Sequence, residues 1–515
     1  MTELYEKIDV DDRVQANNIF NEIKICDPAV GSGHFLVSAL NELIAIKSEL
    51  RILLDRAGKR LKEYRVFVES DELIATDEDG DIVEYYPKSA ESQRVQETLF
   101  HEKQLLIENC LFGVDINPNS VKICRLRLWI ELLKNAYYNG EQQLETLPNI
   151  DINIKVGNSL VGRFALNANL AKALKKAKHG VLDYRKAVSA YRNAKSKDEK
   201  AAMEQIIADI KSHFREDITA NDPLVRNFRK AAELLDTLLG QTMLFKQSEE
   251  EEERYRVEVE SLTATVDRLR VKIRTIEESE IFASAFEWRF EFPEALDEKG
   301  NFIGFDLIIG NPPYGVKSSL VDRKHLLKSI GKVPDYEVYY WFIERAHQLL
   351  RTNGRMTFLI PNSILFNVNA QDYRQNILKR WTIDEMLDCT AFPIFADATV
   401  RNVIMSACKL KTSEFGYRET AGADTFATLV ARPRVQTNDD LLLGNNRNWG
   451  LVFKTSPEVL DIIHKLREGS RAVSTVFPEI SQGLIAYDAH RGQDALTIKN
   501  RIFHSNEKID GSYKP

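Results

Sequence analysis

The sequence predicts an α/β fold with a mostly parallel sheet, because three short apolar runs each end in a polar turn. The runs are Ile23–Cys26, Leu111–Val114 and Phe305–Ile309. Runs this short and this apolar are typical of strands that are covered on both faces. The first run leads through a glycine-bearing turn into an apolar helix expected over residues 34–54. This strand–turn–helix unit is the one from which parallel sheets are built.

The third run leads directly into a rigid loop, Gly310–Tyr314. Pro312 and Pro313 fix two successive φ angles and remove two amide donors, and Pro312 moves Asn311 out of the α conformation. The loop can therefore present an amide side chain, backbone carbonyls and one aromatic ring. These groups suit a planar substrate with an NH2 group, whose hydrogens Asn311 and the Pro312 carbonyl accept while Tyr314 stacks on its ring. A strand that merely ends in a proline turn is the alternative.

Two earlier turns have the features of a nucleotide-binding site. Gly31 and Gly33 precede the expected helix, so a ligand can lie against the backbone and near the N–H groups of the helix amino terminus. The second run ends in Asp115, whose carboxylate can bind the two hydroxyls of a ribose. A further strand is expected over residues 152–156, and it ends just before Asn158.

Together these stretches resemble the S-adenosylmethionine-dependent DNA amino-methyltransferases. The Asp-Pro-Ala-x-Gly-Ser-Gly turn precedes Asn-Pro-Pro-Tyr, as in the adenine-specific gamma class, and the wide spacing is similar to the methylase part of type IIG restriction–modification enzymes. The resemblance covers residues 22–410, most of the chain. It implies a Rossmann-like methyltransferase fold and methylation of the exocyclic amine of a flipped adenine in double-stranded DNA.

The resemblance also implies roles for individual residues. Asn158 stands where the family contacts the cofactor adenine and where many relatives have Asp. By its spacing to Val400 and Val403, Phe395 matches the aromatic residue that sandwiches the flipped base; Phe392 is the alternative, and two core phenylalanines are the plainer interpretation. The implied catalytic residues are Asn311, Pro312, Tyr314 and Phe395. The implied S-adenosylmethionine-binding residues are Asp27, Pro28, Ala29, Gly31, Gly33, Phe35, Asp115, Ile116 and Asn158.

Composition adds limits on compartment and cofactors. The 515 residues are 43% hydrophobic, enough for one large α/β domain with additions. The five cysteines are scattered without metal-ligand spacing, which argues against a zinc site or disulfides and suits a reducing prokaryotic cytoplasm. The sequence contains no apolar run long enough to predict a membrane-spanning helix. The net charge of −7 does not itself indicate DNA, but DNA binding needs only a local basic face.

Motif spacing predicts four parts. Apolar residues alternate by four and three from Leu170 to Tyr191 and from Tyr255 to Ile276, which is typical of a coiled-coil seam. Late in the chain, Phe477–Gly483 resembles the entry to a DNA specificity domain. The expected parts are a cofactor-binding half (1–164) with a β-hairpin insertion (55–90), a helical coiled-coil insertion (165–280), a catalytic half (281–455), and the incomplete start of a specificity domain (456–515).

The resemblance also raises expectations about missing parts. An aromatic-Thr-Pro signature usually found upstream is absent, so we expect an amino-terminal truncation or one piece of a split protein. No Asp…Glu-x-Lys nuclease pattern is found, so a nuclease and the rest of the specificity segment are expected to be separate or missing partners. Alternative functions are a non-catalytic DNA-binding or assembly subunit, and a glutamine or RNA-guanine methyltransferase that uses the same Asn-Pro-Pro-Tyr motif.

Overall fold

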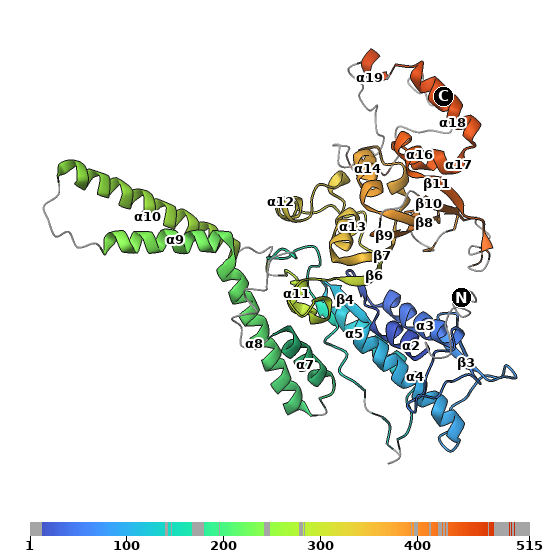
Figure 1. The fold of residues 1–515 in the computed structure, drawn as a ribbon. Coiled ribbons are helices and arrows are strands. Elements are labelled where there is room, and N and C mark those ends of the chain that lie inside the picture. The colour runs from blue at the N-terminus through green and yellow to red at the C-terminus, as the bar shows by residue number, and fades with distance from the viewer. Residues whose placement is uncertain are drawn as a thin grey trace. The chain divides into compact units, whose positions relative to one another are not determined.

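The computed structural model divides into two compact units, Met1–Phe453 and Lys454–Pro515 (Figure 1). It describes residues 13–477 apart from short gaps, together with residues 494, 496 and 499. The gaps are residues 140–142, 146, 167–179, 195, 241–247, 278–281, 283, 393, 396–399, 411–413, 421–424, 426–427, 429–430 and 472.

The first unit is built on a nine-stranded sheet in the order β11-β10-β8-β9-β7-β6-β1-β4-β5. Only β9 and β11 run antiparallel to their neighbours, so the sheet is mostly parallel, as the sequence predicted. The strands are β1 Ile25–Asp27, β4 Leu111–Asp115, β5 Ile154–Val156, β6 Phe305–Gly310, β7 Leu350–Pro361, β8 Thr382–Asp388, β9 Asn402–Cys408, β10 Glu414–Glu419 and β11 Val435–Asn438.

Strand β1 lies at the point where the strand order reverses. From β1 the chain moves outward to β4 and β5, then returns to pair β6 on the other side of β1. Ile25 is therefore opposite both Leu111 of β4 and Leu307 of β6. Ligands of open α/β sheets bind outside the carboxyl ends of the strands at such a reversal. The topology thus directs attention to the turns that follow β1, β4 and β6.

Helices cover both faces of this sheet. Adjacent residues Ile25 and Cys26 belong to two different buried clusters, one on each face. One cluster packs around α13 and the strands β6–β9, and the other around α3, α4 and α5. The helices around the sheet are α2 Arg13–Glu22, α3 His34–Glu49, α4 Ala90–Asn109, α5 Pro118–Leu133, α11 Trp288–Glu291, α12 Leu320–Ser329, α13 Val338–Leu349, α14 Gln371–Arg380, α16 Asp439–Gly444 and α17 Trp449–Lys454.

The expected β-hairpin insertion is present but shorter than predicted. β2 Arg65–Glu69 pairs antiparallel with β3 Glu72–Thr76 through a tight turn in which Ser70 and Asp71 both have positive φ. Residues 81–86, whose alternating pattern is also typical of a strand, do not form one. Only a single bridge between Thr76 and Ile82 marks its place.

The helical insertion forms two helix pairs rather than one coiled-coil hairpin. α7 Val181–Arg192 packs against α8 Lys197–Asn221, and α9 Pro223–Leu239 packs against α10 Glu249–Glu277 (Figure 1). The two seams therefore have different partners. Leu170, Leu174 and Ala177 of the first predicted seam lie outside the described residues.

The first pair is joined to the part of the sheet domain that begins with α11. Tyr184 of α7 donates a hydrogen bond to the Phe290 carbonyl at 2.5 Å, and Arg192 forms an ion pair with Glu294 at 2.9 Å. By contrast, α9 and α10 mainly contact each other: Tyr255 donates to the Leu238 carbonyl at 3.2 Å. Among the described helices of the insertion, the second pair is therefore the one that lies apart from the sheet domain.

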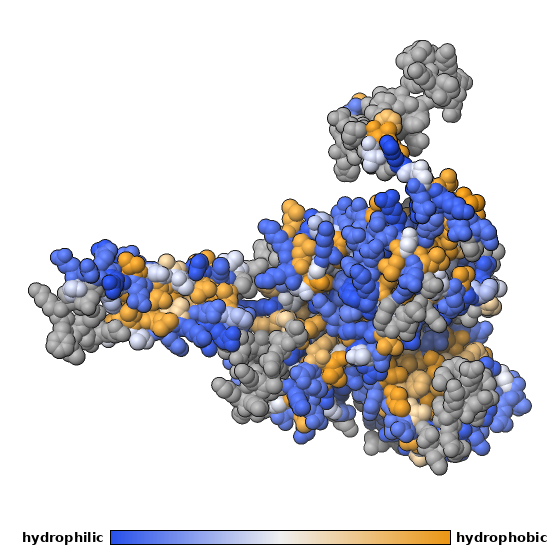
Figure 2. Space-filling model, turned by 45° about the horizontal axis from the view of Figure 1, so that its top comes forward, coloured by the Kyte–Doolittle hydropathy of each residue, from blue (hydrophilic) through white to orange (hydrophobic). Residues whose placement is uncertain are grey.

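The surface of the protein is largely polar, with apolar residues gathered in several patches (Figure 2). Within the described ranges, no helix combines the length and apolar character needed to cross a membrane. In the second unit, the described helices are α18 Pro457–Glu468 and α19 Val473–Val476. Most of the segment predicted to begin a specificity domain, including residues 478–483, lies outside the described residues.

Candidate functional site

A cavity of about 520 Å³ opens at the carboxyl ends of β1, β4, β5 and β6. It brings together residues from all four predicted turns, although they are separated by up to several hundred positions in the chain. The predicted site residues that line it are Pro28, Ala29, Asp115, Ile116, Asn158 and Asn311. Because these strands are neighbours in the sheet, the strand order places the turns side by side.

The first turn is closed by Asp27, which is buried at the end of β1. Its Oδ1 accepts a hydrogen bond from the Ala29 amide at 2.9 Å. A Cβ on Gly310 would lie only 2.6 Å from the same oxygen, and Gly310 has a φ of 154°. Gly310 therefore lets the end of β6 approach the Asp27 carboxyl, where any side chain would collide with it.

Burial raises the pKa of Asp27 to about 7. The Ala29 amide opposes this shift by favouring the carboxylate, while the nearby charge of Asp115 adds to it. Desolvation disfavours the charged form of an acid, so Asp27 changes its charge near neutral pH. A cationic ligand group in this cavity would shift the equilibrium towards the ionised form.

The carboxylate of Asp115 is fixed by two backbone amides. Oδ2 accepts from Gly31 at 2.9 Å, and Oδ1 accepts from Asn117 at 2.7 Å. Gly31 has a φ of 53°, a conformation that favours glycine. A carboxylate has about four acceptor positions, so these two bonds leave further capacity for hydroxyl groups. Asp115 is thus an oriented acceptor on the wall of the cavity.

Gly33 has a packing role that the sequence did not reveal. Its φ is 85°, and a Cβ there would lie 2.5 Å from the Cys124 sulfur of α5. The glycine therefore allows α3 to begin against α5. Neither Gly33 nor Phe35, which is 37% exposed, is among the residues that line the cavity.

The turn after β5 is tied to the turn after β1. The Ser159 hydroxyl donates to the Pro28 carbonyl. The backbone N–H of Asn158 donates to the Ser284 carbonyl at 2.7 Å, and the side-chain oxygen of Asn158 accepts from the backbone N–H of Leu160 at 3.1 Å. Asn158 lies on the cavity wall, but its oxygen is used within its own turn.

The oxygen of Asn311 is the unusual atom of this site. Oδ1 is buried and has no hydrogen-bond partner among the residues that the structure describes. A buried, unsatisfied acceptor costs about 1–3 kcal/mol and is rare in folded proteins. Such an atom on a cavity wall is suited to receive a donor from a ligand. Pro313, rather than the predicted Pro312, lines the cavity beside it, and the half-buried Tyr314 packs against the main core cluster.

Sequence reasoning did not reveal that two helices form the other wall, although it predicted the second of them, α13. Asp322 and Leu326 come from α12, and Val338 and Phe342 come from α13. Residues 316–332 were expected to be a polar loop, but most of them form α12. The apolar residues of the helix predicted near 335–350 could have indicated this wall, although nothing in their spacing separates cavity-lining from core positions.

Phe395 is described but does not belong to the residues that line this cavity. Its side chain is 39% exposed. The alternative, Phe392, is half-buried and also lies outside the lining. Pro393 and residues 396–399 fall outside the described residues. The role of Phe395 in sandwiching a base therefore stays a prediction.

Comparison with known protein families supplies an identification. Residues 109–395, more than half of the chain, match the Eco57I restriction-modification methylase family. The chain belongs to this family. The matched region includes β4, β5, β6 and the Asn311 loop. This confirms the resemblance to the methylases of restriction–modification enzymes that the motifs indicated.

The chain is similar to a protein of Methanocaldococcus jannaschii whose name describes a type II restriction enzyme and methyltransferase. It is 24% identical over 516 residues, which cover 90% of this chain and 36% of the relative. The chain thus spans about a third of that relative's length.

Three solved structures of restriction–modification enzymes are also similar. A nuclease-deletion mutant of the Type ISP enzyme LlaGI with a DNA substrate mimic is 12% identical, with a TM-score of 0.39 over 83% of this chain and 24% of that one. The Type IIL enzyme MmeI with DNA is 11% identical, with a TM-score of 0.35 over 84% and 36%. The EcoKI M protein is 10% identical, with a TM-score of 0.30 over 84% and 52%.

Proposed function

We propose that this chain is the methyltransferase part of a restriction–modification enzyme and methylates the exocyclic amine of adenine in DNA. The observation that carries the proposal is the buried, unpartnered Asn311 oxygen in the same cavity as the Asp115 carboxylate. The first can accept a hydrogen bond from an amine, and the second from the hydroxyls of a ribose. Their meeting in one cavity favours an enzyme that holds an amine beside a nucleoside-bearing cofactor.

The residues of the cavity fit S-adenosylmethionine. The Asp115 carboxylate is oriented by Gly31 and Asn117 and keeps acceptor capacity for ribose hydroxyls. Asp27 precedes the cavity-lining Pro28, and its ionised form complements a cationic ligand. When bound, S-adenosylmethionine supplies a methyl group that its sulfonium has already activated. Within the described residues, no group of side chains has the composition of a metal site.

The Asn311 loop would then prepare the amine. In adenine the lone pair of the amine is delocalised into the ring. If the Asn311 oxygen and the Pro312 carbonyl accept its two hydrogens, the lone pair becomes localised and nucleophilic. Displacement then depends on placement of the reacting atoms rather than on an acid or base. Within the described residues Asn311 Oδ1 has no partner, so no hydrogen bond inside the protein has to break for it to take this role.

A base inside a duplex cannot reach such a loop, so the proposal includes base flipping. Flipping breaks the stacking of the base, and aromatic side chains can replace part of it. Tyr314 is half-buried beside the catalytic asparagine and is the first candidate. Phe395, with its exposed ring, is the second.

The deciding experiment compares Asn311→Ala with the parent chain. Genomic DNA without methylated adenine is incubated with protein and labelled S-adenosylmethionine, and the modified bases are identified by mass spectrometry. We expect N6-methyladenine with the parent and none with Asn311→Ala, whereas cofactor affinity measured by calorimetry stays similar because Asn311 acts in the methyl-transfer step. Asn311→Asp should retain part of the activity, since a carboxylate also accepts these hydrogen bonds.

Asn376→Ala is the matched control, because Asn376 is exposed on α14, outside the cavity. Full activity of Asn311→Ala would refute the mechanism. A product methylated on cytosine would refute adenine specificity. Cofactor binding without any methyl transfer by the parent would favour the non-catalytic subunit, and methylation of a release factor or RNA instead of DNA would favour the other amino-methyltransferases.

A further inference from the structure

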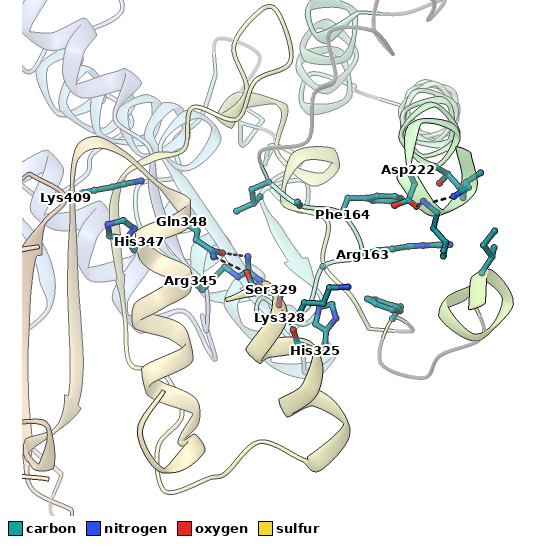
Figure 3. Close-up of a pocket in the computed structure, with 18 residues that line it drawn as sticks. Arg163, Phe164, Asp222, His325, Lys328, Ser329, Arg345, His347, Gln348 and Lys409 are labelled. Atoms are coloured by element: carbon teal, nitrogen blue, oxygen red, sulfur yellow. Dashed lines mark hydrogen bonds between the residues drawn. The ribbon is translucent and has the colours of Figure 1, made fainter. Parts of the chain in front are cut away.

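A second cavity, of about 860 Å³, lies where the helical insertion joins the catalytic half (Figure 3). Its walls come from residues 162–166, the start of α9, one face of α12 and the end of α13. It shares no lining residue with the first cavity, although α12 and α13 contribute to both. It is therefore a separate site that the proposed methylation does not use.

The most informative residue of this cavity is Arg345 on α13. Its side chain is only 6% exposed. One guanidinium nitrogen donates to Gln348 at 2.7 Å and another to the Leu160 carbonyl at 2.7 Å, both of which are neutral acceptors. The buried Nε has no hydrogen-bond partner in the described ranges. An ionised group removed from water normally pairs with an opposite charge, and this one forms no ion pair within the described part of the chain.

The acidic groups near the cavity are already occupied. Glu287 is the one whose charge favours the ionised form of Arg345, but burial still lowers the pKa of Arg345 to about 10. Glu287 itself accepts hydrogen bonds from the amides of Arg163 and Phe164. Asp222 accepts from the Leu224 amide at 2.7 Å as the cap of α9. Neither carboxylate neutralises the guanidinium directly.

Two lysines add to this positive charge. Lys328 of α12 is exposed on the rim, and Lys409 donates only to the Leu350 carbonyl, at 2.8 Å. The two histidines of the lining contribute no charge at neutral pH, because burial lowers the pKa of His325 and brings that of His347 to about 4. The side of the cavity formed by α12 and α13 is therefore cationic.

The side formed by residues 162–166 and the insertion is partly apolar and aromatic. Phe164 lines it with its ring edge-on to Phe290, while Phe282 lies against α12, with its ring edge-on to His325. Leu224 and Ile273 of the insertion complete this side. A cavity with a cationic side and an aromatic side suits a ligand with a phosphate at one end and a flat ring at the other.

We propose that this second cavity binds a nucleoside phosphate, with its phosphates at Arg345 and Lys328 and its base against the rings of Phe164 and Phe282. Arg345 is preorganised for an anion, because its side chain is held by Gln348 and the Leu160 carbonyl while each of the two terminal nitrogens that donate to them keeps a second N–H. The volume of about 860 Å³ is within the range of small-molecule sites.

The test is calorimetric titration of the full chain with ATP, adenosine and inorganic tripolyphosphate. ATP should bind, tripolyphosphate should bind more weakly, and adenosine should not bind this cavity. Lys328→Glu should weaken ATP binding by about tenfold or more, the effect of losing a charge-assisted contact and adding a repulsive charge. Lys324→Glu on the same helix is the matched control, because Lys324 is exposed and does not line the cavity.

Two further variants separate this site from the others. Arg345→Met should also lose ATP binding, with circular dichroism to verify its fold. Asp115→Ala should keep ATP binding, because Asp115 lines only the first cavity. The proposal is overturned if ATP does not bind, if Lys328→Glu binds it normally, or if Asp115→Ala loses it. It is also overturned if duplex DNA is the ligand of this cavity. In that case the apparent affinity for ATP would fall as the DNA concentration rises.

Discussion

At the scale of single residues, Asp27 makes the stability of the protein depend on pH. Its folded pKa of about 7 lies above the ordinary value of 3.8. Below about pH 4 the group is protonated in both states, and its contribution to stability is then fully present. As the pH rises towards 7 the unfolded chain ionises more readily than the folded one, so the free energy of unfolding falls.

Asp27→Asn should remove this dependence. The variant should gain stability relative to the parent as the pH rises from about 4 to 7, by up to about 4 kcal/mol. Thermal midpoints of the two proteins, measured across this range, test the expectation. If the difference between the midpoints does not change with pH, Asp27 is ionised throughout and its environment is more polar than inferred.

Asp115 provides a second test at this scale. Asp115→Ala should weaken S-adenosylmethionine binding by about 1–3 kcal/mol, the effect of a lost charge-assisted hydrogen bond. Part of the loss could come from loosening of the turn, because Asp115 also holds Gly31 and Asn117. Asn117→Ala disturbs the same turn but keeps the carboxylate, so calorimetry on both variants separates the two effects. Equal affinity of Asp115→Ala and the parent would remove Asp115 from the cofactor site.

Single residues also show how much of the site was predictable. Asp115 and Asn311 were found because each follows a strand, and parallel strands bring their carboxyl ends together. The absence of a partner for Asn311 Oδ1 could not be predicted, since it depends on the burial of a single atom. The neutral hydrogen-bond acceptors of Arg345 also could not be predicted, because they depend on where distant carboxylates point.

At the scale of elements, the short apolar strands were predictable, but the buried face of some helices was not. The apolar side expected for α5 consists of Ile123, Leu126, Trp129, Ile130 and Leu133. Trp129 is partly buried against the core, but the other four are 44–53% exposed. The buried side is a second stripe, Val121, Cys124, Leu128 and Leu132. Both stripes have helical spacing, so the sequence alone does not reveal which one faces the sheet. Strand β10 was missed because Glu414–Glu419 is largely polar.

The helical insertion shows the same limit. A heptad seam specifies an apolar face but not its partner. Val188 and Tyr191 of the first seam pack with Ile207 and Ile210 of α8 in a cluster that includes Phe290 of the catalytic half. None of the described residues from α9 and α10 belongs to the core clusters of the sheet domain.

We therefore expect residues 223–277 to be removable but α7 and α8 to be essential. Replacing 223–277 by a short linker should leave S-adenosylmethionine affinity unchanged, since the first cavity contains none of these residues. Removing 181–277 should lower the thermal midpoint strongly, because it deletes the Tyr184–Phe290 hydrogen bond and the Arg192–Glu294 ion pair. Equal stability of the two deletions would show that α7 contributes nothing to the catalytic half.

At the scale of the whole molecule, the first unit contains every residue that lines either cavity. Its last helix, α17, is part of the core: Trp449 is fully buried and contacts Phe415 edge-on. Phe453 stacks on Tyr417 with ring centroids 4.0 Å apart. The first unit therefore ends in the sequence where these aromatic contacts end, and not where the amino-acid composition changes.

A chain that ends after Ser456 should therefore fold and bind S-adenosylmethionine as the full chain does. A chain that ends at Asn448 should unfold at a lower temperature, because it exposes Phe415 and Tyr417 and leaves a cavity where Trp449 was, and aromatic-to-small changes in a core cost about 3–5 kcal/mol. Trp449→Ala in the full chain is the matched control and should reproduce most of that loss. Calorimetric affinity and thermal midpoints measure both expectations, and a chain ending at Ser456 that no longer binds the cofactor would show that residues beyond it complete the site.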